Sequence, residues 1–139
     1  MRRLKISGSI CDESAFGYAH DPLALADDEE KLSRRAREAI LSPGNQKFVS
    51  LTSAWELAIK ISNGKLSFEG GVDNFVRQVD SNGFLMLPIE RSHIVRVEAL
   101  PFHHRDPFDR LLVAAALCEG LAIVTADEHM PAYGVPCVW

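Results

Sequence analysis

The sequence predicts an α/β protein in which a central, mainly parallel sheet lies between two layers of helices. Short apolar runs of strand length alternate along the chain with longer segments of helical periodicity. Strands that are separated by helices are joined by crossovers, which make neighbouring strands parallel. A parallel sheet buries both of its faces, so we expect a three-layer α/β/α sandwich.

The composition is that of one soluble globular domain. The chain has 139 residues, of which 47% are hydrophobic and 24% are charged. Its formal net charge of −4 argues against a broad basic surface for nucleic acid. The three cysteines are scattered, without the spacing of a zinc site or a disulfide framework. No stretch is typical of a membrane span or a signal peptide, so we expect a cytoplasmic protein.

Local signals predict where each element begins and ends. Ser33 starts the first helix, Gly120 ends the long apolar helix, and residues 121–125 form the clearest buried strand. We expect Trp55, Phe75 and Phe108 in the core, and Cys118 packed on an apolar helix face. Helices are predicted over residues 31–41, from a cap at Thr52 or Ser53 to 63–64, and over 72–79, 92–100 and 107–118, and strands over 48–51, 84–87, 121–125 and 136–139.

The start of the long helix carries two carboxylates. Asp106 can cap the helix, Pro107 suits its first turn, and Asp109 follows three residues after the cap. Asp106 and Pro107 therefore explain the helix start. Asp109 is left to point into a cleft, where other acids can join it around a divalent metal.

Two further acids occur where a parallel sheet places its ligands. Asp127 directly follows the strand that ends at Thr125, and Glu56 lies just after the strand that ends at Leu51. Ligands bind at the carboxyl ends of such strands. Oxygen ligands suit Mg²⁺ or Mn²⁺, which can activate water and stabilise charge on a phosphodiester. The acids thus predict hydrolysis of a nucleic-acid strand, with Glu56, Asp109 and Asp127 as catalytic and metal-binding residues.

Each acid also has a structural explanation. Ser53 and Glu56 have the spacing of a capping box, Asp109 suits the positive end of a helix, and Asp127 suits a turn. The convergence of all three at one sheet edge favours the metal site. The His-His-Arg run at residues 103–105 can meet phosphate or form an exposed loop patch, and both interpretations stay open.

Several motifs, taken in order, resemble PIN-domain toxins of the VapC type. They are Trp-Glu-Leu-Ala-Ile-Lys (55–60), Gly-Lys-Leu (64–66), Leu-Pro-Ile (87–89), His-His-Arg-Asp-Pro-Phe-Asp-Arg (103–110), Val-Thr-Ala-Asp (124–127) and Tyr-Gly-Val-Pro (133–136). The resemblance implies a PIN-like fold and a Mg²⁺-dependent ribonuclease, the toxin of a toxin–antitoxin pair, which is a homodimer blocked by its antitoxin. It places the second, third and fourth acids of the family on Glu56, Asp109 and Asp127, with Asp106 as an auxiliary candidate.

The resemblance covers residues 24–139, which we assign to the PIN-like domain, and residues 1–23 form an atypical segment. The family begins with a strand ending in Asp-Thr-His, whereas the corresponding residues here are Gly17, Tyr18 and Ala19. Reading one base later, codons for residues 12–23 can encode Met-Lys-Ala-Leu-Leu-Asp-Thr-His-Met-Thr-Leu-Trp. We therefore interpret this segment as an out-of-frame translation, which the nucleotide sequence can test.

As written, the chain lacks the first metal-binding carboxylate, and Asp12 and Asp21 lack the family's neighbours. We expect the first strand to be supplied by residues 4–10 or by nothing, and nuclease activity to be weak or absent. One alternative is a catalytically silent PIN-like module that binds antitoxin. Another is a response-regulator-like module, which is disfavoured because residues 48–51 end without a phosphoacceptor aspartate.

Overall fold

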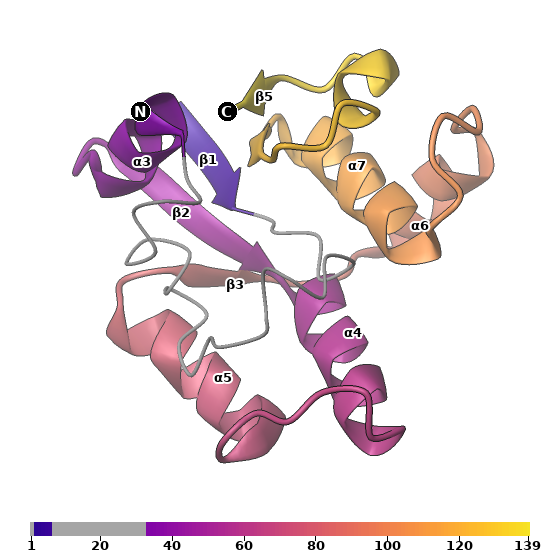
Figure 1. Cartoon of the computed structure of the whole chain (residues 1–139). Coiled ribbons are helices and arrows are strands. Elements are labelled where there is room, and N and C mark those ends of the chain that lie inside the picture. Colours follow the sequence, from indigo (N-terminus) through magenta and orange to yellow (C-terminus); the bar gives the residue numbers. More distant parts are fainter. Residues whose placement is uncertain (1, 7–32) are drawn as a thin grey trace.

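The computed structural model describes residues 2–6 and 33–139 of the chain (Figure 1). One or two helices separate each strand of these residues from the next, as the sequence predicts. In chain order they are β1 (Arg2–Ile6), α3 (Arg34–Leu41), β2 (Asn45–Ser50), α4 (Leu51–Ser62), α5 (Gly71–Ser81), β3 (Leu85–Leu87), α6 (Arg91–Glu98), α7 (Pro107–Glu119), β4 (Ala122–Val124), the 3₁₀ helix η1 (Met130–Tyr133) and β5 (Cys137–Val138).

The sheet has five strands in the order β3-β2-β1-β4-β5, and every neighbouring pair is parallel. The first strand of the chain is central, since β1 pairs with β2 on one side and with β4 on the other. We predicted that residues 4–10 would supply this strand, whereas it covers residues 2–6. All carboxyl ends therefore point to one edge of the sheet, which is where the predicted acids should meet.

Alternate residues of the strands pack into two separate cores, one on each face of the sheet. In β2, Val49 packs against the core that contains residues of α3, α4 and α5, whereas Phe48 packs against the core that contains residues of α7. Successive residues of β4 divide in the same way: Val124 joins the first core and Ile123 the second. The two cores confirm the predicted α/β/α sandwich, because each face of a parallel sheet must be covered by helices.

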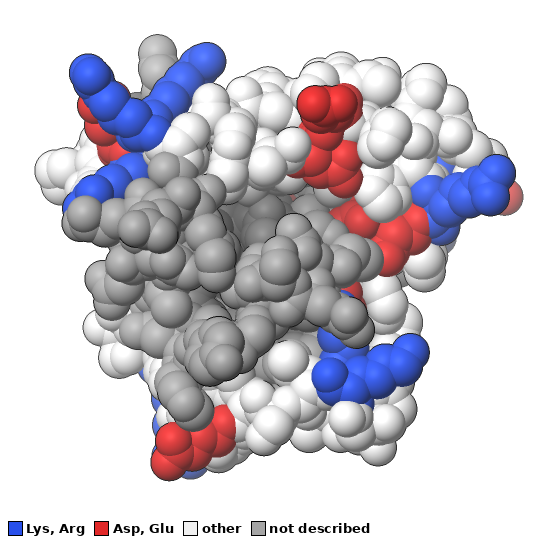
Figure 2. Space-filling model, viewed as in Figure 1, with Lys and Arg blue, Asp and Glu red and all other residues white. Residues whose placement is uncertain are grey.

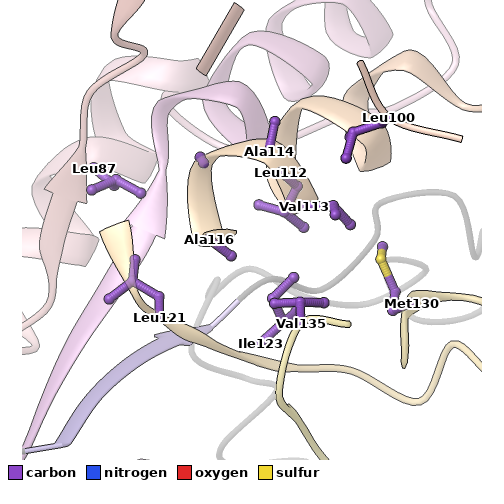
Figure 3. Packing of buried hydrophobic residues seen from close by; sticks show 11 residues of the cluster. Leu87, Leu100, Leu112, Val113, Ala114, Ala116, Leu121, Ile123, Met130 and Val135 are labelled. Carbon is purple, nitrogen blue, oxygen red and sulfur yellow. The ribbon is translucent and has the colours of Figure 1, made fainter. Parts of the chain in front are cut away.

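The second core fixes α7, the helix that begins with the Asp106–Asp109 motif. Figure 3 shows Leu112, Val113 and Ala116 of this helix among side chains from β4 and the C-terminal segment. Val113 and Ala116 are completely buried. Burying side chains of this size stabilises the fold by roughly 1–3 kcal/mol each, so the start of α7 is held firmly against the sheet edge.

The structure corrects the predicted start of α4. The preceding strand ends at Ser50, and Leu51, which we placed in the strand, is the first helical residue. The side chain of Ser50 accepts a hydrogen bond from the Thr52 backbone N–H at 3.2 Å, so Ser50 is the cap in place of Thr52 or Ser53. The helix therefore begins two or three residues earlier than predicted, and Ser53 and Glu56 do not form a capping box.

Some predicted core residues are exposed. Phe75 is buried, but Trp55 is 54% exposed and Phe108 is only partly buried. Cys118, which we expected to pack on an apolar helix face, is also exposed. We predicted burial from the apolar residue type, whereas the side of the helix on which a residue lies decides whether it is buried. None of the helices in the described part of the chain has the length and apolar character needed to cross a membrane.

Candidate metal centre

Two of the predicted acids meet at the carboxyl edge of the sheet. Asp109 lies in the first turn of α7, and Asp127 lies in the loop that follows β4. One ligand atom from each of these residues and one from His104 lie within 4.8 Å of one another. The convergence of Asp109 and Asp127 therefore agrees with the argument from strand ends.

Asp127 is oriented by its own loop. Its backbone N–H donates to Thr125 Oγ1 at 3.0 Å, and its Oδ1 accepts from the His129 N–H at 2.8 Å. This is the turn that we weighed as a structural explanation for Asp127. The turn does not exclude a site, because Oδ2 points to His104 and the side chain retains 20% exposure.

Asp109 is held by the helix start that the sequence predicts. Asp106 Oδ1 accepts from the N–H groups of Phe108 and Asp109 at 2.8 and 3.3 Å, so Asp106 is the cap. Asp109 itself is buried. Its pKa rises to about 6 because burial disfavours its charged form and because Asp106, Glu56 and Asp127 repel it, while His104 acts in the opposite direction.

Glu56 lies near this group but outside the close contact of His104, Asp109 and Asp127. It is 5% exposed on α4, and its Oε1 lies 3.2 Å from Lys60 Nζ, one helical turn away. An edge-to-face contact between Trp55 and Phe108, with ring centroids 5.1 Å apart, joins the neighbouring positions of α4 and α7. Glu56 is thus close enough to raise the pKa of Asp109, with its own charge partly offset by Lys60.

His104 is the residue whose place the sequence did not predict. We considered residues 103–105 as a phosphate-binding run or an exposed loop patch. Instead the His104 side chain is 18% exposed and faces inward, with Nε2 2.8 Å from Asp127 Oδ2 and 3.2 Å from Asp109 Oδ2. His103 and Arg105 remain exposed. The spacing of His104 two residues before the cap Asp106 was the one local signal of this role.

Arg110 and Tyr133 hold the loop that carries His104. Arg110 is 6% exposed, and its guanidinium donates to three carbonyl oxygens at the end of α6 and beyond it: Val97 at 3.2 Å, Leu100 at 3.1 Å and Pro101 at 2.7 Å. Tyr133 Oη accepts from the His104 backbone N–H at 2.7 Å and from Arg110 at 3.4 Å. The residue after Asp109 therefore also positions the histidine.

The donor chemistry of this group fits a hard divalent cation. Mg²⁺ and Mn²⁺ favour carboxylate oxygens and keep several waters. Burial first, and the neighbouring acids second, raise the pKa of Asp109, so its charged form lacks compensation here. A cation between Asp109 and Asp127 would supply that compensation, and Glu56 would add further negative charge nearby.

The described residues on the face shown in Figure 2 do not form a broad basic surface. Among the described residues visible in Figure 2, lysine and arginine side chains lie in separate places toward the rim of the face. Acidic side chains gather on the upper right of the same view. This distribution agrees with the net charge of −4.

Fold and site together define a class: α/β proteins that gather carboxylates at the carboxyl edge of a parallel sheet. The family model of the PIN domain matches residues 11–136, and the chain belongs to this family. This confirms the resemblance seen in the sequence motifs. The match begins within residues 1–23, which we set apart as atypical. The positions of Gly17, Tyr18 and Ala19 lie outside the described residues, as do Asp12 and Asp21.

Solved structures with the same fold come from VapBC complexes. VapBC2 from Rickettsia felis, bound to a DNA fragment from its promoter, gives a TM-score of 0.61 at 13% identity, over 97% of this chain and 96% of that one. DNA-bound VapBC from Salmonella typhimurium gives 0.55 at 14% identity, over 99% and 97%. VapBC-1 from nontypeable Haemophilus influenzae gives 0.56 at 13% identity, over 99% and 96%. A search of curated proteins finds no significant match.

Proposed function

We propose that the chain is a metal-dependent endoribonuclease, the toxin of a toxin–antitoxin pair. The observation that carries this proposal is the meeting of the Asp109 and Asp127 carboxylates at the sheet edge, with buried Glu56 beside them. Membership of the PIN domain family and similarity in fold to VapBC structures support it. Mg²⁺ is the proposed metal and Mn²⁺ an alternative, because both prefer oxygen ligands.

In this proposal Glu56, Asp109 and Asp127 bind the metal, which when bound activates water and stabilises charge on the scissile phosphodiester. Burial of Asp109 keeps its carboxylate in place and strengthens its attraction to a cation. Lys60 holds Glu56 in position through the contact at 3.2 Å. These roles need no movement of the sheet, because α4 and α7 are packed on it.

We further propose that turnover of the chain as written is weak. Where the family has its first acidic ligand, this sequence has Gly17, Tyr18 and Ala19, and none of them offers a carboxylate. Loss of one charged ligand weakens metal binding and the activation of water. If residues 1–23 are an out-of-frame translation, the gene in the other frame encodes the fully active enzyme, and sequencing its codons at residues 17–20 decides this.

The test is cleavage of a structured RNA with Mg²⁺ or Mn²⁺, comparing the chain with Asp109→Asn and Asp127→Asn. Any cleavage by the unchanged protein should fall by more than about 100-fold in either variant, more than loss of an outer partner of a metal ligand costs. Asp80→Asn, an exposed acid in α5, is the matched control and should keep full activity. Strong cleavage that survives Asp109→Asn would contradict the proposed site.

The second candidate function is a silent PIN-like module that binds an antitoxin without cutting RNA. The missing first acid is the observation that favours it. The two candidates differ in one measurement: the silent module captures a co-expressed antitoxin but shows no RNA cleavage with either metal. We propose an antitoxin as the partner in both cases, together with a homodimer and a cytoplasmic location.

A further inference from the structure

The Nε2 atom of His104 lies between the two carboxylates that we propose as metal ligands. It is 2.8 Å from Asp127 Oδ2 and 3.2 Å from Asp109 Oδ2. Geometry alone would allow His104 to be a third metal ligand, since imidazole and carboxylate are both common ligands. The hydrogen bond at the other ring nitrogen argues against that role.

The backbone N–H of Asp106 donates to His104 Nδ1 at 3.2 Å. Nδ1 must therefore offer a lone pair, and in a neutral imidazole the proton then lies on Nε2. A protonated Nε2 donates to Asp127 Oδ2, faces Asp109 Oδ2 and cannot bind a cation. Asp106 is itself fixed as the cap of α7, so the helix start determines which nitrogen of His104 carries the proton.

The backbone of His104 is restrained as well as its ring. Its N–H donates to Tyr133 Oη at 2.7 Å, and buried Arg110 contacts the same oxygen and the carbonyl of Pro101. These contacts come from η1 and α7, elements that pack in the second core. His104 therefore reaches the carboxylates from a rigid support.

We propose that His104 is a positioning residue that uses its Nε2–H to hold the Asp109 and Asp127 carboxylates together and does not itself bind the metal. The inference rests on the proposed function, because it assigns the role of His104 at that metal site. Hydrogen-bonded partners of this kind fix the orientation of metal ligands.

The first test is the protonation of the His104 ring, measured by ¹⁵N NMR on the full chain. We expect Nε2 to carry the proton in the absence of metal and after saturation with Mg²⁺. A proton on Nδ1 in the metal-free protein, or loss of the Nε2 proton when Mg²⁺ binds, would overturn the proposal. This measurement does not depend on RNA cleavage.

The second test compares the Mg²⁺ affinity of His104→Ala and His104→Gln by calorimetry. Alanine removes the donor and should weaken binding by about 10–100-fold. Glutamine carries an N–H group at similar reach and should restore affinity to within about threefold of the unchanged chain. His103→Ala, at the exposed neighbouring position, is the control and should bind Mg²⁺ normally. Equal affinity for all variants would contradict a positioning role.

The outcomes separate this proposal from the proposed function. If Mg²⁺ binds and Nε2 keeps its proton but RNA is not cut, the assignment of His104 stands and the ribonuclease proposal fails. If RNA is cut while Mg²⁺ removes the Nε2 proton, only the assignment fails. Absence of Mg²⁺ binding overturns both. If His104→Ala does not fold, the NMR measurement of the ring proton and the Mg²⁺ affinity of His104→Gln still test the proposal.

Discussion

At the scale of single residues, the candidate site combines charges that repel one another with contacts that hold them in place. Asp109 is buried beside Asp106, Glu56 and Asp127, and its pKa rises to about 6. Such a carboxylate destabilises the metal-free fold, since a group kept out of water favours its neutral form. This cost is typical of a functional site, where stability is given up for binding.

We therefore predict that Asp109→Asn stabilises the metal-free protein. Asparagine has nearly the same shape and no charge, so unfolding at neutral pH should require on the order of 1–3 kcal/mol more. Thermal unfolding in the presence of a chelator measures this, and the midpoint should rise by several degrees. A lower midpoint in the variant would mean that the contacts of Asp109 outweigh its repulsion.

The raised pKa of Asp109 also sets how the stability of the fold depends on pH. Below the ordinary pKa of 3.8, Asp109 is protonated in both the folded and the unfolded chain. Between pH 3.8 and about 6, Asp109 keeps its proton only in the folded chain. The contribution of protonated Asp109 to stability is therefore lost as the pH rises through this window. The difference between Asp109→Asn and the unchanged protein should therefore grow from pH 4 to pH 6, and level off above it.

At the scale of elements, helix starts show how far local signals reach. Ser33 and Asp106 cap α3 and α7 as predicted, because their side-chain oxygens accept backbone N–H groups within three residues. The predicted cap of α4 was wrong because three nearby residues, Ser50, Thr52 and Ser53, all have a side-chain oxygen that can cap a helix. The pairing of Ser50 with Leu87 in the sheet selects Ser50, and this pairing is not local in sequence.

Arg110 is the element-scale link that no sequence argument assigned. It joins the first turn of α7 to the end of α6 through three carbonyl oxygens. Carbonyls at a helix end need partners, and a buried guanidinium supplies several donors in a fixed geometry. The end of α6 and the loop with His104 thus depend on one side chain.

We predict that Arg110→Met lowers the free energy of unfolding by about 2–4 kcal/mol, because it removes three hydrogen bonds, one of them the buried bond to the Leu100 carbonyl. The stability of Arg110→Lys should lie between that of the unchanged protein and that of Arg110→Met, since lysine keeps the charge but not the planar set of donors. Urea unfolding measures both. Arg77→Met, an exposed position whose pair with Asp73 is open to solvent, is the control and should change stability by less than about 1 kcal/mol. Similar losses at both arginines would contradict a special role of Arg110.

At the scale of the whole molecule, α4 presents an apolar stripe. Leu51, Trp55 and Ile59 follow one another at intervals of four residues and are 42%, 54% and 37% exposed. Residues four apart lie on the same side of a helix, so these side chains form one surface. Exposed apolar surface of this kind is typical of a protein interface, and we assign it to the proposed homodimer.

We predict that Ile59→Glu weakens dimerisation more than tenfold, because it places a charge in an apolar contact. Light scattering after size-exclusion chromatography gives the mass at a series of concentrations. Leu41→Glu, at another exposed apolar position on α3, is the matched control and should leave the dimer intact. A monomeric unchanged chain would show the homodimer to be wrong, and a dimer that tolerates Ile59→Glu would place the interface elsewhere.

The sequence by itself determined the fold class and most of the element positions, and it proposed the three acids, because these depend on signals within a few residues. Periodicity identifies helices and strands, and the alternation of the two predicts parallel strands whose ends meet at one edge. From this we could expect Asp109 and Asp127 to converge. The local sequence also contains the cap at Asp106, whose backbone N–H donates to His104 Nδ1.

The tertiary structure alone decided which side chains touch across long separations in the chain. His104 meets Asp127 across 23 residues, and Arg110 joins the ends of two helices. It also decided that Trp55 is exposed and that Glu56 is buried. Residue type and local spacing do not contain this information, because burial and contact depend on how the packed helices are rotated against the sheet.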